Sequence, residues 1–293
     1  MAESSGQRYA AIEAGGTHIR CVISQQDTFK AEREVSFATA SPAQVMPAIL
    51  GFFQQGPQFA AIGVASFGPL VIDGDDPAYG TILNSPKLDW QGFSWPAALE
   101  PLMVPVHVHT DVVAAALAEA AATNVTDLLA YITVGTGIGL GLVRAGKCLP
   151  GNRHAEFGHI YVRQHPDDAY VGCCPYHGNC LEGLASGAAL IDRWDVPAEH
   201  LDVSHAWHIQ AYYLAQACVT LYRTLTPQRI VLVGGVMGGG VIGKEALLEL
   251  VRSQCEVQLG GYYAQGFDGH EVIVLPNLGS RSGIVGALTL AAS

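Results

Sequence analysis

The chain has 293 residues, of which 49% are hydrophobic and only 14% are charged, and its formal net charge is −11. This composition predicts a large hydrophobic core and excludes an intrinsically disordered chain. The acidic balance, with no run of Lys or Arg, argues against a protein that binds nucleic acid, because phosphate backbones are neutralised by clustered basic residues.

Membrane and export signals are also not expected. The most apolar stretch, residues 128–143, is interrupted by threonines and glycines, whereas a membrane span needs about 20 predominantly apolar residues. The first ten residues are polar and contain no apolar signal-peptide core. We therefore expect a cytoplasmic protein without a membrane partner.

Hydrophobic periodicity predicts strands and helices in alternation along the chain. Strands are expected at residues 8–13, 18–24, 60–65, 105–109, 128–134, 138–143, 229–233 and 271–275, and helices at 42–53, 111–122, 186–194, 205–225, 242–257 and 281–292. Residues 9–24 and 130–143 share one pattern, a strand, a tight glycine turn with a threonine, and a second strand. The repeated hairpin predicts a duplicated α/β unit with a cleft between the copies.

The segment from residue 150 to residue 184 has few periodic apolar residues and contains a cluster of cysteines and histidines. Its pattern H-x14-C-x2-H-x2-C is formed by His159, Cys174, His177 and Cys180. Thiolate and imidazole are ligands that Zn²⁺ prefers, and four protein ligands are typical of a closed, structural site. His165 is an alternative fourth ligand, and Cys173 is an alternative to Cys174. A redox pair of the two adjacent cysteines is the competing interpretation.

The order of motifs in this segment resembles the zinc segment of the ROK-family fructokinases. The resemblance rests on Glu156-Phe-Gly-His159-Ile, His165-Pro-Asp-Asp and Cys174-Pro-Tyr-His177-Gly-Asn-Cys180-Leu-Glu182. It extends to Glu13-Ala-Gly-Gly-Thr17, which resembles the family's phosphate turn, and to Thr110-Asp111-Val-Val, which resembles its base-bearing helix. Residues 227–237, Pro-Gln-Arg-Ile-Val-Leu-Val-Gly-Gly-Val-Met, resemble its nucleotide strand.

This resemblance implies an actin-like ATPase fold, also described as ribonuclease H-like, with two domains around a cleft. The domains would comprise residues 1–110, completed by a C-terminal helix at 281–293, and residues 111–280, including the zinc loop 150–184. The implied activity is ATP-dependent phosphorylation of a hexose, here D-fructose to fructose 6-phosphate, with a structural zinc, Mg²⁺ bound with ATP, and a homodimer. The alternatives are a kinase for mannose, glucose or N-acetylmannosamine, and a non-catalytic sugar-binding regulator.

The resemblance also assigns roles to residues. Asp111, which follows a predicted strand and opens a predicted helix, would be the catalytic base, although Asp is also a favoured plain N-cap. Sugar-binding candidates are Glu156, Glu182, His159, Thr110, Gly68, Pro69 and Asn84. His159 would bind the metal through one ring nitrogen and the sugar through the other. Solvated surface glutamates are the competing interpretation of Glu156 and Glu182.

Nucleotide binding is expected at two glycine turns and at the late strand. Backbone N–H groups of Gly15, Gly16, Thr17, Gly135, Thr136 and Gly137 would contact phosphates, although ordinary hairpin glycines are the competing interpretation. The adenosine would contact Ala188, Gly234, Gly235, Val236, Met237 and Gly238, and Glu13 would reach Mg²⁺. Three residues depart from the family's usual pattern: His18 for Lys, Val113 for Asn, and Ala188 for Pro.

Overall fold

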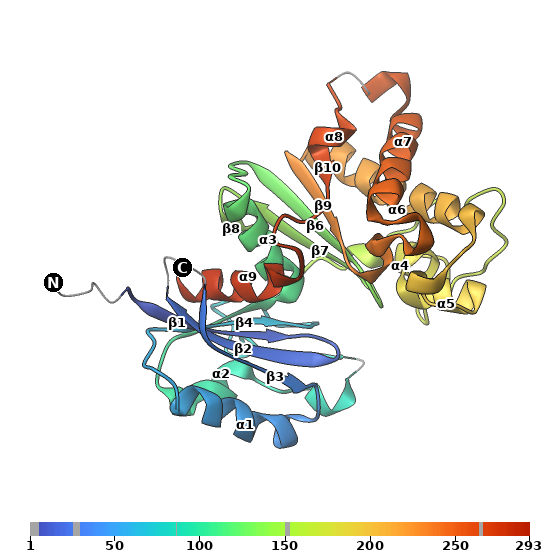
Figure 1. Cartoon of the computed structure of the whole chain (residues 1–293). Coiled ribbons are helices and arrows are strands. Elements are labelled where there is room, and N and C mark those ends of the chain that lie inside the picture. The colour runs from blue at the N-terminus through green and yellow to red at the C-terminus, as the bar shows by residue number, and fades with distance from the viewer. Residues whose placement is uncertain (1–5, 26–29, 86, 150–152, 264–265) are drawn as a thin grey trace. The chain divides into compact units, whose positions relative to one another are not determined.

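Figure 1 shows a computed structural model of the chain, which describes residues 6–25, 30–85, 87–149, 153–263 and 266–293. The first three residues of the predicted zinc segment, 150–152, and residues 1–5, 26–29 and 86 of the predicted first domain lie outside the described residues. The chain divides into two compact units: unit 1 comprises residues 1–122, 148–154 and 280–293, and unit 2 comprises residues 123–147 and 155–279. Residues 111–122, which the sequence analysis placed in the second domain, group with unit 1.

Unit 1 contains a five-stranded sheet in the order β3-β2-β1-β4-β5. The strands are β1 (Arg8–Ala14), β2 (His18–Gln25), β3 (Ala31–Ala38), β4 (Ile62–Ser66) and β5 (Val106–Thr110). β1, β2 and β3 pair antiparallel, whereas β4 pairs parallel with β1 and β5 parallel with β4. The sequence analysis missed β3 because its residues alternate only between partly buried and exposed positions.

Helices cover both faces of this sheet. The face containing Ile12 packs against α1 (Pro42–Gln54) in one hydrophobic cluster. The opposite face, containing Glu13, meets α9 (Ser282–Ala291), which also packs on α3 (Asp111–Ala122) (Figure 1). A side chain at Gly63 or Gly286 would collide with the neighbouring backbone, so these glycines permit the close packing of α9. The shorter helices of this unit are α2 (Trp95–Leu99) and the 3₁₀ helices Leu88–Trp90 and Glu100–Leu102.

Unit 2 repeats the connectivity of unit 1. Its sheet has the order β10-β9-β6-β7-β8, formed by β6 (Leu128–Val134), β7 (Ile138–Arg144), β8 (Lys147–Cys148), β9 (Arg229–Val233) and β10 (Ile273–Val274). β6 and β7 form an antiparallel hairpin, β9 lies parallel to β6, and β10 lies parallel to β9. In each sheet the first strand therefore lies between the second and the fourth, and the predicted duplicated α/β fold is confirmed.

The helices of unit 2 are α4 (Leu181–Ala185), α5 (Gly187–Trp194), α6 (Ser204–Leu225), α7 (Lys244–Tyr263) and α8 (Gly269–Val272). The 3₁₀ helices are Phe157–His159, Ala198–His200, Gly235–Gly238, Gly240–Ile242 and Gly279–Arg281, the last of which extends into unit 1. The strand predicted at 271–275 is wrong in its first half, because Asp268 accepts bonds from the N–H groups of His270 and Glu271 and starts α8. Among the described residues, no helix is both long and apolar enough to cross a membrane.

Candidate functional site

The first group of predicted site residues lies at one edge of the unit 1 sheet. The parallel strands are in register, with Ala14 opposite Ser66 and Ser66 opposite Thr110. The chain therefore leaves β1, β4 and β5 at the same edge, and these ends are followed by the glycine turn, the loop of Gly68, and Asp111. Carboxyl ends of parallel strands are where α/β proteins usually place ligand sites.

Asp111 is the first residue of α3 and is half-buried. Its Oδ1 accepts a hydrogen bond from the backbone N–H of Val112 at 2.8 Å. Burial raises the pKa of Asp111 to about 6, although the Val112 N–H acts in the opposite direction. A carboxylate with a pKa near neutrality is suited to accept a proton from a hydroxyl. Asp111 is itself the first helical residue and accepts the N–H of the next residue, so the bond does not have the geometry of an N-cap.

Glu13 lies near the end of β1, facing α9. Its Oε2 is 3.6 Å from Nη1 of Arg20, and Gly283 of α9 leaves room for its carboxylate. Burial raises the pKa of Glu13, Arg20 lowers it, and Asp111 raises it again. The Asp111 carboxylate is therefore near enough to disfavour the charged form of Glu13.

The first glycine turn is held by a side chain that the sequence analysis missed. Gly15 donates its N–H to the carbonyl of His18 at 2.9 Å, which closes the turn. Nζ of Lys87 donates to the carbonyl of Gly16 at 2.5 Å. The sequence analysis noted His18 where relatives often have Lys, and Lys87 brings an ammonium group to this turn from a loop about 70 residues further along.

The loop candidates for sugar binding are neighbours in unit 1. The Gly68–Pro69 peptide bond is cis, and the carbonyl of Pro69 accepts the N–H of Leu83 at 2.7 Å. A Cβ at Gly68 would lie 4.0 Å from Cγ2 of Thr110. Asn84 follows Leu83 and is exposed. The structure thus brings Gly68, Pro69, Asn84 and Thr110 into one group of loops at the carboxyl edge of the sheet.

The predicted metal ligands converge in unit 2. The donor atoms of His159, Cys174, His177 and Cys180 all lie within 4.8 Å of one another. Cys174 and Gly178 form a tight turn through two backbone hydrogen bonds, Gly178 N–H to Cys174 O at 2.9 Å and Cys174 N–H to Gly178 O at 3.3 Å. The N–H of Leu181 donates to Ile160 at 2.9 Å, which joins the start of α4 to the end of the 3₁₀ helix that carries His159.

The spacing of these atoms fits a tetrahedral zinc ion. Zn–S bonds of about 2.3 Å and Zn–N bonds of about 2.0–2.1 Å give an S···N edge of about 3.6 Å in a tetrahedron. Sγ of Cys174 lies 3.7 Å from Nδ1 of His159 and 3.7 Å from Nδ1 of His177, and Sγ of Cys180 lies 3.6 Å from Nδ1 of His159. The alternative ligands His165 and Cys173 are not in the group, and Cys173 contacts the Tyr170 side chain instead.

Two carboxylates flank this cluster. His159 turns Nδ1 toward the two sulfurs, while its Nε2 lies 4.0 Å from Oε2 of Glu156, which is exposed. Glu182 is half-buried, and its Oε2 accepts the N–H of Ile138 at 2.8 Å. A Cβ at Gly137 would lie only 2.6 Å from the same oxygen, so the glycine is required for this placement.

The remaining nucleotide candidates surround the second glycine turn. The carbonyl of Gly135 accepts the N–H of Gly187 at 2.7 Å, so the turn and the start of α5, which carries the exposed Ala188, lie together. Gly234 follows β9 with φ 111°, against the backbone of Val134. The side chains of Val236 and Met237 are buried in the hydrophobic core of unit 2, which leaves their backbone to contact a ligand.

Known proteins resemble this chain over nearly its whole length. Residues 9–293 match the model of the ROK family. A putative fructokinase of Bacillus subtilis is 39% identical over 96% of this chain and 94% of its own length. A fructokinase of Zymomonas mobilis is 39% identical over 97% of this chain and 96% of its own length. The crystal structure of a ROK hexokinase from Thermus thermophilus superposes with a TM-score of 0.75 at 27% identity, covering 98% of each chain. The fold is therefore the predicted actin-like ATPase fold, and the chain belongs to the ROK family.

Proposed function

We propose that this protein is an ATP-dependent hexose kinase that transfers the γ-phosphoryl group to D-fructose and forms fructose 6-phosphate. The observation that carries the proposal is the placement of Asp111, a half-buried carboxylate with a pKa of about 6, in the sheet register that also positions the Gly15–Thr17 turn. The near full-length similarity to two proteins named fructokinase supports fructose as the acceptor.

The chemistry assigned to unit 1 is proton transfer and phosphate binding. Asp111 takes the proton of the attacking hydroxyl as the phosphoryl group arrives. Backbone N–H groups of Gly16 and Thr17 contact the phosphates, the N–H of Gly15 closes the turn on His18, and Lys87 adds a positive charge beside that turn. Glu13 is the residue that would hold Mg²⁺, the metal that neutralises the charge of bound ATP.

The chemistry assigned to unit 2 is sugar and nucleotide binding. Glu156 and Glu182 accept hydrogen bonds from sugar hydroxyls, and Nε2 of His159 is turned toward the same side as Glu156. His159, Cys174, His177 and Cys180 would hold a structural zinc ion, which would fix the direction of these side chains. The Gly135–Gly137 turn contacts phosphate, and Ala188 with residues 234–238 contacts the adenosine.

The proposal is tested by measuring ADP release from MgATP with a panel of sugars: fructose, glucose, mannose and N-acetylmannosamine. We expect the highest kcat/KM with D-fructose. A preference for another hexose would favour the second candidate, a kinase of different specificity, which the hexokinase from Thermus thermophilus makes reasonable. Sugar binding without ADP release from any sugar would instead identify a non-catalytic regulator.

We also propose that the chain forms a homodimer, as the family resemblance implies. Light scattering coupled to size-exclusion chromatography measures the mass in solution directly. A mass of one chain, 30.9 kDa, across the working concentration range would refute the dimer and leave the proposed chemistry unaffected.

A further inference from the structure

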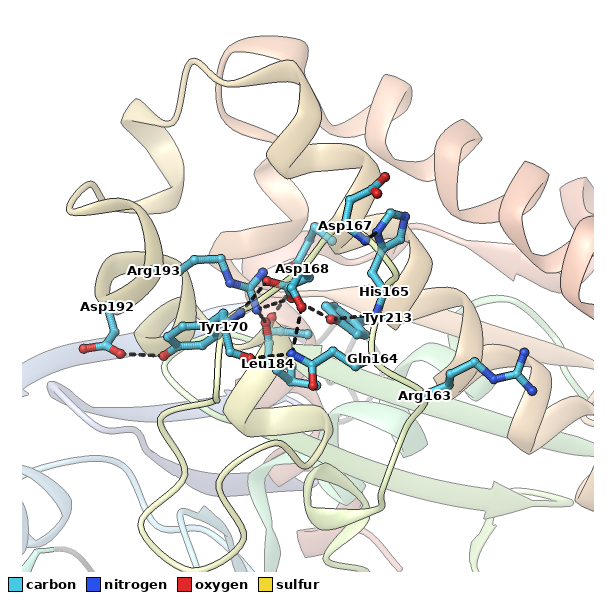
Figure 2. A network of polar contacts seen from close by, with 12 residues as sticks. Arg163, Gln164, His165, Asp167, Asp168, Tyr170, Leu184, Asp192, Arg193 and Tyr213 are labelled. Atoms are coloured by element: carbon cyan, nitrogen blue, oxygen red, sulfur yellow. Dashed lines mark hydrogen bonds and ion pairs between the residues drawn. The ribbon is translucent and has the colours of Figure 1, made fainter.

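A buried ion pair lies next to the metal-binding segment and has no part in the proposed chemistry. Nη2 of Arg193, in α5, is 3.2 Å from Oδ2 of Asp168, and the two side chains are only 6% and 4% exposed (Figure 2). Burying two charges carries a desolvation penalty that their attraction often fails to offset. The contribution of such a pair to stability therefore does not by itself explain why it is present, and we consider what the pair positions.

Asp168 organises the loop between the metal ligands His159 and Cys174. Its Oδ2 accepts the hydroxyl of Tyr213, in α6, at 2.6 Å, and its Oδ1 accepts the N–H of Tyr170 at 3.1 Å. Nε2 of Gln164 donates to the backbone carbonyls of Asp168 and Tyr170 at 2.9 and 2.6 Å. Figure 2 shows the Arg193 guanidinium and the Tyr213 hydroxyl meeting at the Asp168 carboxylate. Residues 164–170 are thus held as a compact loop fastened to α6.

Arg193 connects the same carboxylate to α4, the short helix that carries Glu182. Its Nη2 also donates to the carbonyl of Leu184 at 2.8 Å, while Nε2 of Gln210 donates to the next carbonyl, that of Ala185, at 2.6 Å. These carbonyls lie at the end of α4, where no intrahelical partner is available. Cys180 immediately precedes α4. The guanidinium thus joins the loop before Cys174 to the helix after Cys180.

The position of the guanidinium is determined by its shape as well as its charge. It lies 4.5 Å from the ring centroid of Tyr170 and 5.8 Å from that of Tyr213. Its Nε and Nη1 are buried without a hydrogen-bond partner in the described part of the chain, and the aromatic rings supply cation–π attraction in place of such partners. A lysine ammonium is compact and has no planar face to pack between rings, so it should not replace this group.

We infer that Arg193 and Asp168 are positioning residues that set the geometry of the metal ligands and of Glu182 for sugar binding. The inference rests on the proposed function for its kinetic consequence only. Removing either side chain releases the 164–170 loop from α4, so that Cys174 and Cys180 no longer approach one another from fixed supports. Asp111, the proposed base in unit 1, is not part of this network and keeps its position.

The experiment compares Arg193→Met, Arg193→Lys, Asp168→Leu and the double variant Arg193→Met/Asp168→Leu in the zinc-loaded protein. The control is Arg144→Met, which removes an exposed ion pair of the same unit, with side chains 66% and 63% exposed. Zinc release is followed with a colorimetric chelator, together with the melting temperature and the KM values for fructose and ATP. The double variant leaves no unpaired buried charge and recovers the stability that the single variants lose.

We expect each single variant, Arg193→Lys included, to weaken zinc retention about 10- to 100-fold, the range typical of groups that orient metal ligands. We expect the double variant to regain the wild-type melting temperature but not the wild-type zinc retention. In the single and double variants alike, the KM for fructose should rise at least about tenfold, while the KM for ATP should stay within about twofold of wild type. The inference would be overturned if the single variants retained zinc as wild type does, or if the double variant recovered wild-type zinc retention. A parallel rise of the KM values for fructose and ATP would also overturn it. If no sugar is phosphorylated, the proposed function fails and zinc retention alone still tests the pair.

Discussion

The ionised form of Asp111, which is the form that acts as a base, should lower the free energy of unfolding of the chain. Its pKa is about 6 in the folded chain, against an ordinary value of 3.8. Because the folded pKa is the higher one, the folded chain binds this proton more tightly, and stability falls as the pH rises through the interval between the two values. A difference of about two pKa units corresponds to about 3 kcal/mol above that interval.

Asp111→Asn removes this ionisation while keeping an oxygen that can accept the N–H of Val112. The variant should gain about 3 kcal/mol at pH 8 but only about 0.5 kcal/mol at pH 4, where the carboxyl is protonated in the folded chain and close to half protonated in the unfolded chain. At about 2–4 °C per kcal/mol, the melting temperature at pH 8 should rise by about 6–12 °C. Turnover should fall about 10²- to 10⁴-fold, the usual contribution of a general base.

The assay is thermal unfolding of wild type and Asp111→Asn at both pH values, together with kcat at pH 8. Asp89→Asn is the matched control, because Asp89 is an exposed carboxylate of the same unit. The control should unfold within about 1 °C of wild type at both pH values. A lower melting temperature for Asp111→Asn at pH 8, or a change of equal size at both pH values, would refute the reasoning from burial.

Four further outcomes are expected. The kcat/KM for fructose should decline below a midpoint near pH 6, since the base must be ionised; a midpoint near 4 would contradict the raised pKa of Asp111. Cys180→Ser should lose bound zinc by metal analysis while Cys173→Ser keeps it, and equal zinc contents would contradict the ligand set. Lys87→Met should raise the KM for ATP about tenfold with no such change in the exposed-site control Lys147→Met, and an unchanged KM would remove Lys87 from the phosphate site. Gly137→Ala should raise the KM for fructose by displacing Glu182, and unaltered kinetics would show that this carboxylate does not hold the sugar.

Much of the fold is readable from the sequence because each unit starts with an alternating strand, a glycine turn and a second strand. The hairpins β1–β2 and β6–β7 follow this pattern closely. β3 escaped prediction because it lies at the sheet edge and is only partly buried, so its apolar alternation is weak. α8 escaped because four residues are too few to show a helical period, and Asp268 acts through its side chain rather than through hydrophobicity.

The candidate site was predictable where its residues are close in sequence. The spacing of His159, Cys174, His177 and Cys180 indicated a metal cluster, but it could not choose between the adjacent Cys173 and Cys174. That choice depends on the turn at Gly178, which directs one sulfur toward the histidines. Pairings between distant residues, such as Lys87 with the Gly16 carbonyl, carry no signal in a single sequence.

The most direct test is to identify the phosphorylated product formed from MgATP and D-fructose by the zinc-loaded protein, using ³¹P NMR. We expect stoichiometric fructose 6-phosphate and ADP with the wild type, and fructose 6-phosphate formation about 10²- to 10⁴-fold slower with Asp111→Asn. A wild-type protein that leaves fructose unphosphorylated, or an Asp111→Asn variant that forms fructose 6-phosphate at the wild-type rate, would contradict the assignment of this carboxylate as the base of a fructose kinase.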